Sequence, residues 1–365
     1  MGFTCGIVGL PNVGKSTLFN AITVAGANVA NYPFCTIDPN IGVVSVPDRR
    51  LERLAGIYQS SAIVSTTLEF LDIAGLVKGA STGEGLGNQF LSHIRLVDAI
   101  AHVVRCFDDP NIIHVNSDVN PRSDIEVIET ELILKDLETV EKKHVEAEKK
   151  TKTGDKKSKL EEDFCAALMR HLQIGRLARY LLPKNDDEQL WLRDMHLLTS
   201  KPVMYICNVH EKELMNENSY VEQVKEIAAK EGANVVVVSA AVEAEISQLP
   251  ANERQAFLDE LGLQESGLSK VIREGYAMLH LLTFFTAGPK ETRAWTVRKG
   301  TTAPTAAGEI HTDFEKGFIR AEIIRFSDLD RLGSEAAVRE AGLLRAEGRD
   351  YVMEDGDVMF VRFHV

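Results

Sequence analysis

The amino-terminal third of the chain alternates short, continuously apolar runs with segments in which apolar residues recur at helical spacing. Runs that are apolar throughout are typical of strands covered on both faces of a parallel sheet. We therefore expect an α/β domain. Its strands are predicted at residues 3–8, 67–72, 99–106, 203–208 and 234–239, and its first helix at 16–24.

The pattern changes between about residues 122 and 200. Apolar residues recur at helical spacing from Ile125 to Val140 and again from Leu160 to Leu181, with charged residues between them. This spacing predicts two long helices that form an antiparallel hairpin. Because the sheet pattern resumes at Lys201, we expect the hairpin to be an insertion in the α/β domain.

A third pattern begins after about residue 275. Short strands are predicted at 293–297, 319–324 and 357–363, and turns that contain Gly317 and Gly356 separate them. This part of the chain is expected to form a small, sheet-rich α+β module.

A complete G-x-x-x-x-G-K-S sequence lies between the first predicted strand and the first predicted helix, from Gly9 to Ser16. Glycines at its two fixed positions allow the backbone to turn, so that N–H groups and the start of the helix can cradle phosphate. Lys15 is expected to reach the β- and γ-phosphates, and the Ser16 hydroxyl to bind Mg²⁺. The expected nucleotide contacts are Asn12, Val13, Gly14, Lys15, Ser16 and Thr17.

Two further segments contain residues of the kind that respond to a γ-phosphate. Asp72 ends a predicted strand and could bind Mg²⁺, while the N–H of Gly75 could meet the γ-phosphate. Gly75 and Lys15 are therefore our candidates for stabilising the transferred phosphoryl group. Thr36 is a candidate switch threonine that would close on Mg²⁺, although its proline-bracketed segment also fits an ordinary loop. The glycine-dense stretch 79–87 favours a second switch segment.

Three sequence stretches resemble the YchF/Obg-like ATPase family, a branch of the Obg-related P-loop GTPases. They are the phosphate-binding sequence continued to Thr17, N-Y-P-F-C-T-I-D-P at 31–39, and K-G-A-S-T-G-E-G-L-G-N at 78–88. The resemblance covers nearly the whole chain. It implies a P-loop NTPase G domain at 1–275, a helical hairpin inserted at 122–200 and a TGS domain at 278–364. It also implies an Mg²⁺-dependent ATPase that contacts ribosomes.

The sequence that selects the base in GTPases is N-K-x-D, whereas this chain has Asn208-Val209-His210-Glu211. The aspartate of that motif accepts two hydrogen bonds from guanine, and Glu211 stands in its place here. Adenine presents a donor at N6, and Asn208 could pair with an adenine edge as asparagine does in nucleic-acid recognition. The departure therefore favours ATP over GTP, as the resemblance also implies. Ser239, at the end of the last predicted strand, matches the loop that backs the base.

The residue that would orient the attacking water is missing from its usual place. Many GTPases have glutamine directly after D-x-x-G, but this chain has Leu76, which cannot hydrogen-bond to water. His93, His102 and His114 are candidate substitutes, each with a surface or packing role as its alternative. His114 is preferred because it lies in a polar loop after a core strand. Asn12 is also a candidate ligand for K⁺, as in potassium-activated relatives.

The amino-acid composition argues against several classes of protein and several cellular locations. A formal net charge of -13 argues against a protein that coats DNA. The five cysteines contain no C-x-x-C pair, so neither a disulfide framework nor a zinc site is expected, and reduced thiols indicate the cytoplasm. No apolar stretch approaches the roughly 18 residues of a membrane span, so no membrane partner is expected. The first apolar run is interpreted as a strand and not as a signal peptide.

The expected partners come mainly from the resemblance. TGS domains imply contact with ribosomes, and we expect the large subunit and its RNA to be the target of a monomeric protein. Composition does not show RNA binding, because 12 Lys and Arg stand against 14 Asp and Glu from Leu281 onward. The hairpin tip at 149–159, with six lysines and one acidic residue, could meet phosphates or be a solvated turn. Trp295 and Phe318 could stack on bases, although core packing is the simpler role.

Two functions are compatible with these observations. The first is an ATPase whose hydrolysis resets ribosome binding, with a role in translation or stress regulation. The second is a binding protein that ATP or GTP gates and whose hydrolysis is incidental, a hypothesis that Leu76 keeps open. A P-loop metabolic kinase is disfavoured, because we find no motif for an acceptor substrate.

Overall fold

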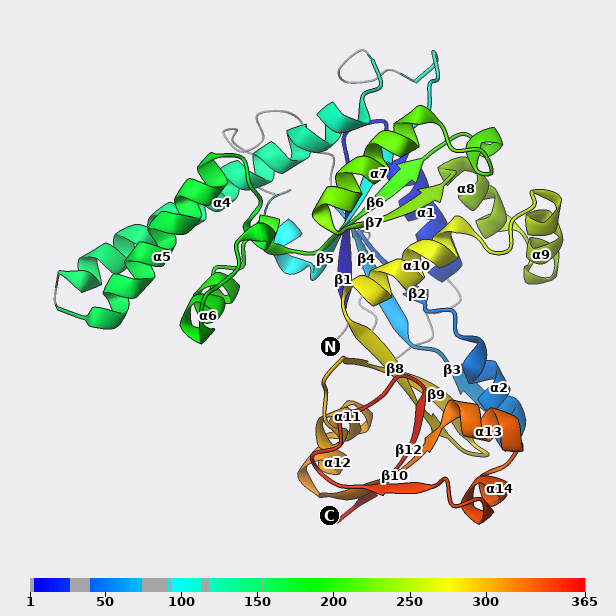
Figure 1. Ribbon diagram of the computed structural model, residues 1–365. Coiled ribbons are helices and arrows are strands. Elements are labelled where there is room, and N and C mark those ends of the chain that lie inside the picture. Colours follow the sequence, from blue (N-terminus) through cyan, green and yellow to red (C-terminus); the bar gives the residue numbers. More distant parts are fainter. Residues whose placement is uncertain are drawn as a thin grey trace. The chain divides into compact units, whose positions relative to one another are not determined.

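The computed structural model shows two compact units formed from a single chain (Figure 1). The amino-terminal unit comprises Met1–Val43 and Glu69–Val271, and the carboxy-terminal unit comprises Val44–Leu68 and Ile272–Val365. The structure describes residues 3–26, 40–73, 91, 93–112, 118–152 and 154–364.

The described part of the amino-terminal unit is built on a six-stranded sheet with the order β2-β4-β1-β5-β6-β7. The pairs from β4 through β7 are all parallel, as the apolar runs predicted. All seven residues of β5 are buried, including the two polar residues His102 and Arg105 that interrupt its apolar run. The strands are β1 (Thr4–Val8), β2 (Ile41–Ser45), β4 (Thr67–Asp72), β5 (Ala99–Arg105), β6 (Val203–Asn208) and β7 (Asn234–Val238).

Helices flank this sheet, and α1 packs against α8 beside it (Figure 1). A carboxylate stabilises the start of α10, because Glu243 of α8 accepts the N–H groups of Gly267 at 2.7 Å and Leu268 at 3.0 Å. Such a contact suits the positive end of a helix. The helices are α1 (Lys15–Gly26), α7 (Ser219–Glu231), α8 (Ala240–Gln248), α9 (Ala251–Glu260) and α10 (Gly267–Met278), which continues into the carboxy-terminal unit.

The two long helices predicted between residues 122 and 200 are present as α4 (Pro121–Thr151) and α5 (Lys156–Gln173). The expectation that the second helix continues to Leu181 was wrong. Gly175 has a φ of +76° and its N–H donates to the Leu172 carbonyl at 2.9 Å, which ends α5 in a left-handed turn. The apolar residues beyond this turn belong to a separate short helix, η2 (Ala178–Tyr180).

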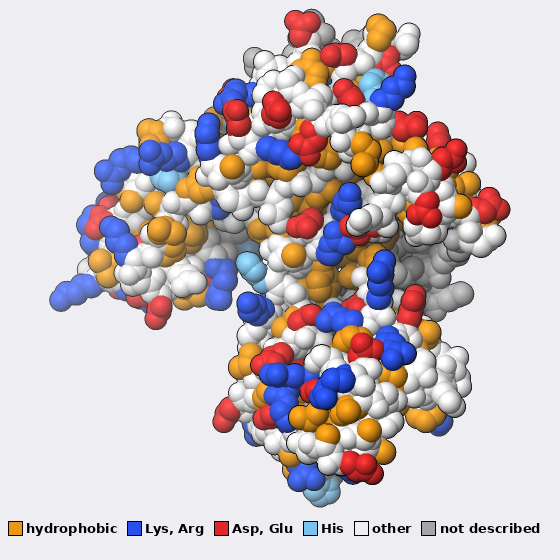
Figure 2. Space-filling model, turned by 45° about the vertical axis from the view of Figure 1, so that its right-hand side comes forward, with side chains coloured by type: hydrophobic (Ala, Val, Ile, Leu, Met, Phe, Trp, Pro, Cys, Tyr) orange, Lys and Arg blue, Asp and Glu red, His pale blue; other side chains and the backbone are white. Residues whose placement is uncertain are grey.

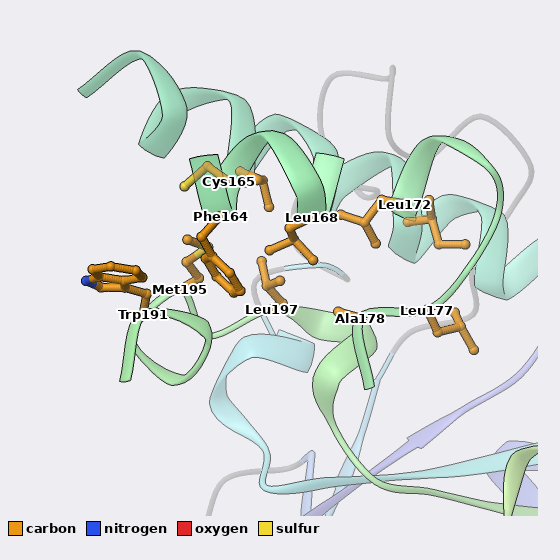
Figure 3. Packing of buried hydrophobic residues seen from close by; sticks show 11 residues of the cluster. Phe164, Cys165, Leu168, Leu172, Leu177, Ala178, Trp191, Met195 and Leu197 are labelled. Atoms are coloured by element: carbon orange, nitrogen blue, oxygen red, sulfur yellow. The ribbon is translucent and has the colours of Figure 1, made fainter. Parts of the chain in front are cut away.

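A local hydrophobic core holds the hairpin to the segment that follows it. In Figure 3, Phe164 and Leu168 of α5 point toward Leu197, and Phe164 also contacts Trp191 at a ring distance of 5.9 Å. Trp191 lies on α6 (Asp186–Asp194), which precedes η3 (Leu198–Ser200). Leu160, which shares the predicted apolar stripe, is 60 % exposed, so the stripe is buried only in its later turns.

The carboxy-terminal unit has a second sheet, which is six-stranded within the described residues and has the order β11-β10-β12-β8-β9-β3. The predicted strands at 293–297, 319–324 and 357–363 are all present, within β9, β10 and β12. The strands are β3 (Ala62–Val64), β8 (Leu281–Ala287), β9 (Glu291–Arg298), β10 (Phe318–Arg325), β11 (Arg345–Glu347) and β12 (Asp357–Phe363).

Both faces of this second sheet are covered by helices. One apolar cluster joins the sheet to α11 (Ala303–Ile310), and a second joins it to α2 (Arg49–Tyr58) and α13 (Phe326–Leu332). Two short helices, α12 (Thr312–Lys316) and α14 (Glu335–Glu340), complete the unit. Phe318 is 4 % exposed and belongs to the first cluster, so its role is core packing.

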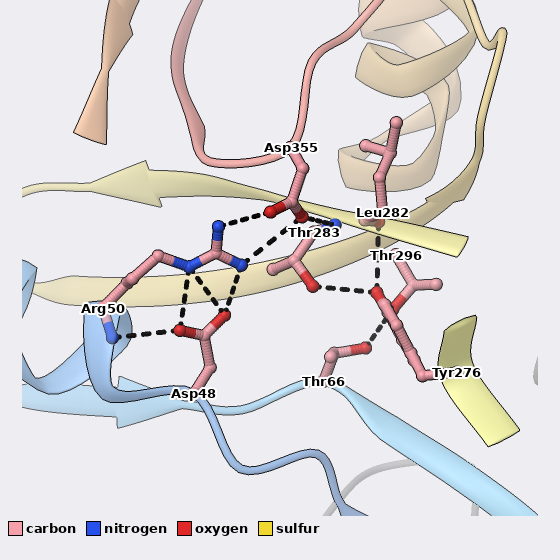
Figure 4. Close-up of polar contacts among 8 residues, drawn as sticks. All are labelled: Asp48, Arg50, Thr66, Tyr276, Leu282, Thr283, Thr296 and Asp355. Carbon is pink, nitrogen blue, oxygen red and sulfur yellow. Dashed lines mark hydrogen bonds and ion pairs between the residues drawn. The ribbon is translucent and has the colours of Figure 1, made fainter. Parts of the chain in front are cut away.

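Residues Val44–Leu68 group with the carboxy-terminal unit, whereas the sequence analysis placed them in the first domain. Strand β3 pairs in parallel with β9, which extends the second sheet by one strand. Polar contacts fasten the same segment (Figure 4). The Arg50 guanidinium lies between the carboxylates of Asp48 and Asp355, at 2.8 Å and 2.5 Å. Asp355 in turn accepts the Thr283 N–H at 2.9 Å.

Charges of both signs are interspersed on the face of the carboxy-terminal unit that Figure 2 shows. The lysine-rich hairpin tip is also partly neutralised by its own neighbours. Lys152 pairs with Glu148 at 2.8 Å, and Lys157 pairs with Asp187 at 2.8 Å. Lys159 pairs with Glu162 at 3.1 Å. These ion pairs reduce the positive charge that the tip presents to solvent.

Among the described helices, none combines the length and the apolar character that crossing a lipid bilayer requires.

Candidate functional site

The phosphate-binding sequence forms a tight loop between β1 and α1, and two of its glycines cannot be replaced without strain. Gly14 has a φ of +94°, and a Cβ there would lie 2.1 Å from Nδ2 of Asn208. A Cβ on Gly9 would lie 2.7 Å from the carbonyl oxygen of Val103 in β5. Asn12 also adopts a left-handed conformation, with a φ of +63°. The loop therefore needs glycine at both fixed positions for reasons of backbone conformation and space.

Lys15 begins α1, and its ammonium group forms an ion pair with the carboxylate of Asp72, the last residue of β4. The two side chains are 9 % and 21 % exposed. Residues 57 positions apart in the sequence are therefore brought together at the carboxyl edge of the sheet, where parallel α/β sheets bind ligands. The sequence-predicted phosphate-binding lysine and Mg²⁺-binding aspartate thus share one site.

The donors at this site fit a small, hard cation. Ser16 and Thr17 are exposed in the first turn of α1 and carry hydroxyl groups, and Asp72 carries a carboxylate. Mg²⁺ prefers oxygen ligands and takes few of them from the protein, the rest coming from phosphate and water. In the described part of the chain, no three His, Cys, Asp or Glu side chains gather to form a closed metal site.

Asn208 joins the phosphate-binding loop to the loop after β7. Its Nδ2 donates to the Val13 carbonyl at 2.9 Å, and its Oδ1 accepts the Ala240 N–H at 2.9 Å. The residue is only 4 % exposed. Both polar atoms therefore have protein partners, which differs from the expected pairing of Asn208 with an adenine edge. The geometry favours a positioning role in which Asn208 holds the two loops together.

The other expected base-site residues differ in their exposure. Val209 is 2 % exposed and packs in the core beside β6, so it cannot cover a base as a lysine would. Glu211 is exposed and begins the short helix η4 (Glu211–Glu213). Ser239 is 2 % exposed and is the N-cap residue of α8. Glu211 is thus the accessible side chain of this group.

Several candidate catalytic residues lie outside the described residues, namely His114, Thr36 and Gly75. Of the alternatives to His114, His93 is half-buried in the helical turn at 93–96. His102 is 3 % exposed in the middle of β5, where its ring lies 5.5 Å from that of Tyr205. Burial and the charge of Arg179 lower the pKa of His102 to about 3. His102 is therefore a neutral core residue rather than an acid or base.

Stability at acid pH should report this buried imidazole. Between about pH 6.5 and pH 3 the unfolded chain protonates His102 and the folded protein does not, so acid favours unfolding. We expect His102→Gln to flatten the fall of the unfolding free energy between pH 7 and pH 5, by up to about 1.4 kcal/mol per pH unit. Urea titrations of both proteins at pH 7, 6 and 5 measure this. Parallel pH profiles would contradict the buried, neutral state.

Sequence reasoning missed one buried and one half-buried charged group near the sheet. Arg105 is 2 % exposed at the end of β5, and an arginine inside an otherwise apolar run is the signal that could have revealed it. The second group centres on Arg179, which lies 2.8 Å from Glu231, while the Tyr205 hydroxyl donates to Glu231 at 2.8 Å. Burial and the charge of Glu231 raise the pKa of nearby Glu129 to about 7.

A phosphate-binding loop between an inner strand of a parallel sheet and the following helix, with an aspartate facing the loop lysine, defines a P-loop nucleoside triphosphatase. A family model described as a 50S ribosome-binding GTPase matches residues 4–151. A second model, named YchF-GTPase_C and described as a protein of unknown function, matches residues 281–364.

Full-length relatives are more specific. The chain is 57 % identical over 365 residues to the ribosome-binding ATPase YchF of Escherichia coli O157:H7, and each chain is covered completely. It is 53 % identical over 367 residues to the protein of that name from Bacillus subtilis, again over the whole of both chains. The solved structure of the Schizosaccharomyces pombe YchF GTPase matches with a TM-score of 0.88 and 41 % identity, over 99 % of this chain and 98 % of that one. The chain belongs to the YchF family.

Proposed function

We propose that this protein is an Mg²⁺-dependent ATPase that prefers ATP to GTP and associates with ribosomes in a manner gated by the nucleotide. The observation that carries the proposal is the contact of Lys15 with Asp72 at the phosphate-binding loop. Without nucleotide, the Lys15 ammonium group and the Asp72 carboxylate neutralise each other. A triphosphate with Mg²⁺ offers a new partner to both, so binding exchanges one ion pair for contacts to phosphate and metal. Ser16 and Thr36 complete the proposed Mg²⁺ ligands, and the N–H of Gly75 meets the γ-phosphate.

The preference for ATP rests on the base site. The buried Val209 stands where GTPases have lysine, and the longer Glu211 stands where they have aspartate. The Glu211 carboxylate lies one methylene further from the backbone than that of aspartate. It therefore no longer matches the two guanine N–H donors from which the aspartate accepts hydrogen bonds. One good bidentate base contact discriminates by about 1–3 kcal/mol, or roughly ten- to a hundredfold. Loss of that contact removes the main advantage of guanine.

Affinity for the two nucleotides tests this proposal directly. We expect calorimetry of the full chain with Mg²⁺ to show tighter binding of ATP than of GTP. Tighter binding of GTP would mean that Glu211 still recognises guanine, and the ATPase assignment would fail. Nucleotide titrations and hydrolysis assays in potassium and sodium salts also test the proposed role of Asn12 as a K⁺ ligand. Equal affinities and equal hydrolysis rates in the two salts would contradict that role.

Hydrolysis is proposed to depend on His114, since Leu76 cannot orient water. Turnover measured with and without ribosomes separates the two candidate functions. Strong stimulation, lost in His114→Ala, supports an ATPase whose hydrolysis resets binding. A slow rate that ribosomes leave unchanged supports the alternative, in which the nucleotide is only an effector.

The ribosome as partner is inferred from the printed names of the relatives. We propose that a monomer in the cytoplasm contacts the large subunit and its RNA through the hairpin and the carboxy-terminal unit. Co-sedimentation with separated subunits, in the presence of ATP or ADP, tests both the subunit and the gating. Equal sedimentation with both nucleotides would contradict gating.

A further inference from the structure

Arg105 is the last residue of β5, and its guanidinium holds the loop that follows. Nε donates to the Phe107 carbonyl at 3.0 Å, and Nη1 donates to the Ile112 carbonyl at 3.0 Å. Nη2 donates to the Asp109 carbonyl at 3.3 Å. The same group lies over the Phe107 ring, 4.7 Å from its centre. A buried guanidinium that donates three hydrogen bonds to the carbonyl groups of one loop fixes the backbone of that loop.

This loop is connected to the turn after β6. The rings of Phe107 and His210 lie 4.8 Å apart, and Nε2 of His210 donates to the Asp108 carbonyl at 3.0 Å. The Tyr220 hydroxyl donates to the Asp108 carboxylate at 3.1 Å. Two elements that are distant in sequence are therefore joined by a ring contact and by hydrogen bonds to Asp108.

The turn after β6 is fastened at a second point. Asn218 Nδ2 donates to the Cys106 carbonyl at 2.7 Å and to the Glu213 carboxylate at 2.9 Å. Glu213 also accepts the His210 N–H at 3.1 Å. Glu211, the accessible base-site residue, lies between His210 and Glu213 in this fastened turn. Its position is thus determined by contacts that reach back to β5.

These contacts lie largely at the surface. Asp108 and His210 are both exposed, although Phe107 and Arg105 are buried. Exposed contacts of this kind usually change the stability of a protein by less than about 0.5 kcal/mol. Their consequence is local, because they restrict one turn beside the nucleotide site.

We propose that Arg105 and His210 are positioning residues for base recognition. Arg105 fixes the loop at 107–112, and His210 connects this loop to the turn that carries Glu211. The inference rests on the proposed function and adds to it that the turn carrying Glu211 contacts the base. It adds Arg105, which lies outside the base motif at 208–211 and outside the phosphate-binding loop, and it gives His210 of that motif a role through its neighbours.

The test compares a ligand that has a base with one that has none. Inorganic tripolyphosphate with Mg²⁺ uses the phosphate-binding loop alone, whereas ATP also uses the base site. We expect His210→Ala to weaken ATP binding about tenfold, the low end of one base contact, and to leave tripolyphosphate binding within about twofold. Arg105→Lys keeps the charge but loses the three-way donor geometry, and should act in the same direction.

His144→Ala is the matched control, since His144 is a half-exposed histidine on α4. It should change neither affinity. A ratio of ATP to tripolyphosphate affinity that stays at the wild-type value in His210→Ala overturns the proposal, even if Arg105→Lys fails to fold. If the wild-type protein prefers GTP, the ATPase assignment fails, but the positioning role can still be tested. The ratio of the affinities for GTP and for tripolyphosphate then replaces the ratio for ATP.

Discussion

Replacing Gly14 by alanine is expected to lower the affinity for MgATP by about a hundredfold. The new methyl carbon would lie 2.1 Å from Nδ2 of Asn208, at a backbone φ of +94°. The left-handed conformation costs an alanine about 1–2 kcal/mol. Asn208 cannot yield freely, because its amide is bonded to Val13 and Ala240, and each such bond contributes about 0.5–1.5 kcal/mol. The loop must therefore open where it cradles phosphate.

Calorimetric titration of Gly14→Ala with MgATP measures this loss. Gly56→Ala is the matched control, because Gly56 lies within α2 and a Cβ there meets nothing within 4 Å. The control should bind ATP like the wild type and should gain slightly in stability from the better helix propensity of alanine. Unchanged ATP affinity in Gly14→Ala would mean that the loop accepts a side chain there, contrary to its geometry.

Replacing Asp136 by alanine is expected to lower the free energy of unfolding by about 3–5 kcal/mol. Asp136 lies on α4, is 1 % exposed, and accepts the N–H groups of Leu198 and Thr199, each at 2.8 Å. The Thr199 hydroxyl donates to it at 2.6 Å. Removing the carboxylate leaves two buried backbone N–H groups without these acceptors, at the point where η3 leads into β6.

Urea denaturation of the purified chain, followed by circular dichroism, measures the loss. Asp163→Ala serves as control, since the Asp163 side chain is 63 % exposed on α5 and forms a surface ion pair with Lys159. Exposed ion pairs contribute about 0–1 kcal/mol, so this variant should unfold near the wild-type midpoint. Equal midpoints for Asp136→Ala and Asp163→Ala would show that the buried carboxylate is not needed.

The strands were the most predictable part of the fold. The predicted bounds of β4 and β6 match the structure, because each run ends at a polar residue, Asp72 and Asn208, although Glu69 interrupts the apolar run of β4. The end of α5 was not predictable in the same way. Leu177 continues the helical spacing of apolar residues, but Gly175 adopts a left-handed turn and ends the helix first. The periodic spacing of apolar residues indicates which residues become buried. It does not indicate to which helix or turn each of them belongs.

The phosphate-binding part of the site was also predictable from the sequence, since its residues are consecutive and its glycines meet a local backbone requirement. The base site was less so. The motif identified Asn208, but its chemistry depends on Val13 and Ala240, which are distant in sequence. Arg105 itself interrupts an apolar run and could have been noticed, but its partners, the carbonyls of the following loop, leave no trace in residue types.

The sequence by itself determined the features that depend on neighbouring residues: the parallel strands, the two hairpin helices, the phosphate-binding loop and the substituted base motif. Only the tertiary structure decided that Asp72 meets Lys15 and that residues Val44–Leu68 join the second sheet. The physical reason is the same in each case. A local pattern reflects backbone conformation and burial, whereas a pairing between distant segments is selected by the packing of the whole chain and by the need of buried polar groups for partners.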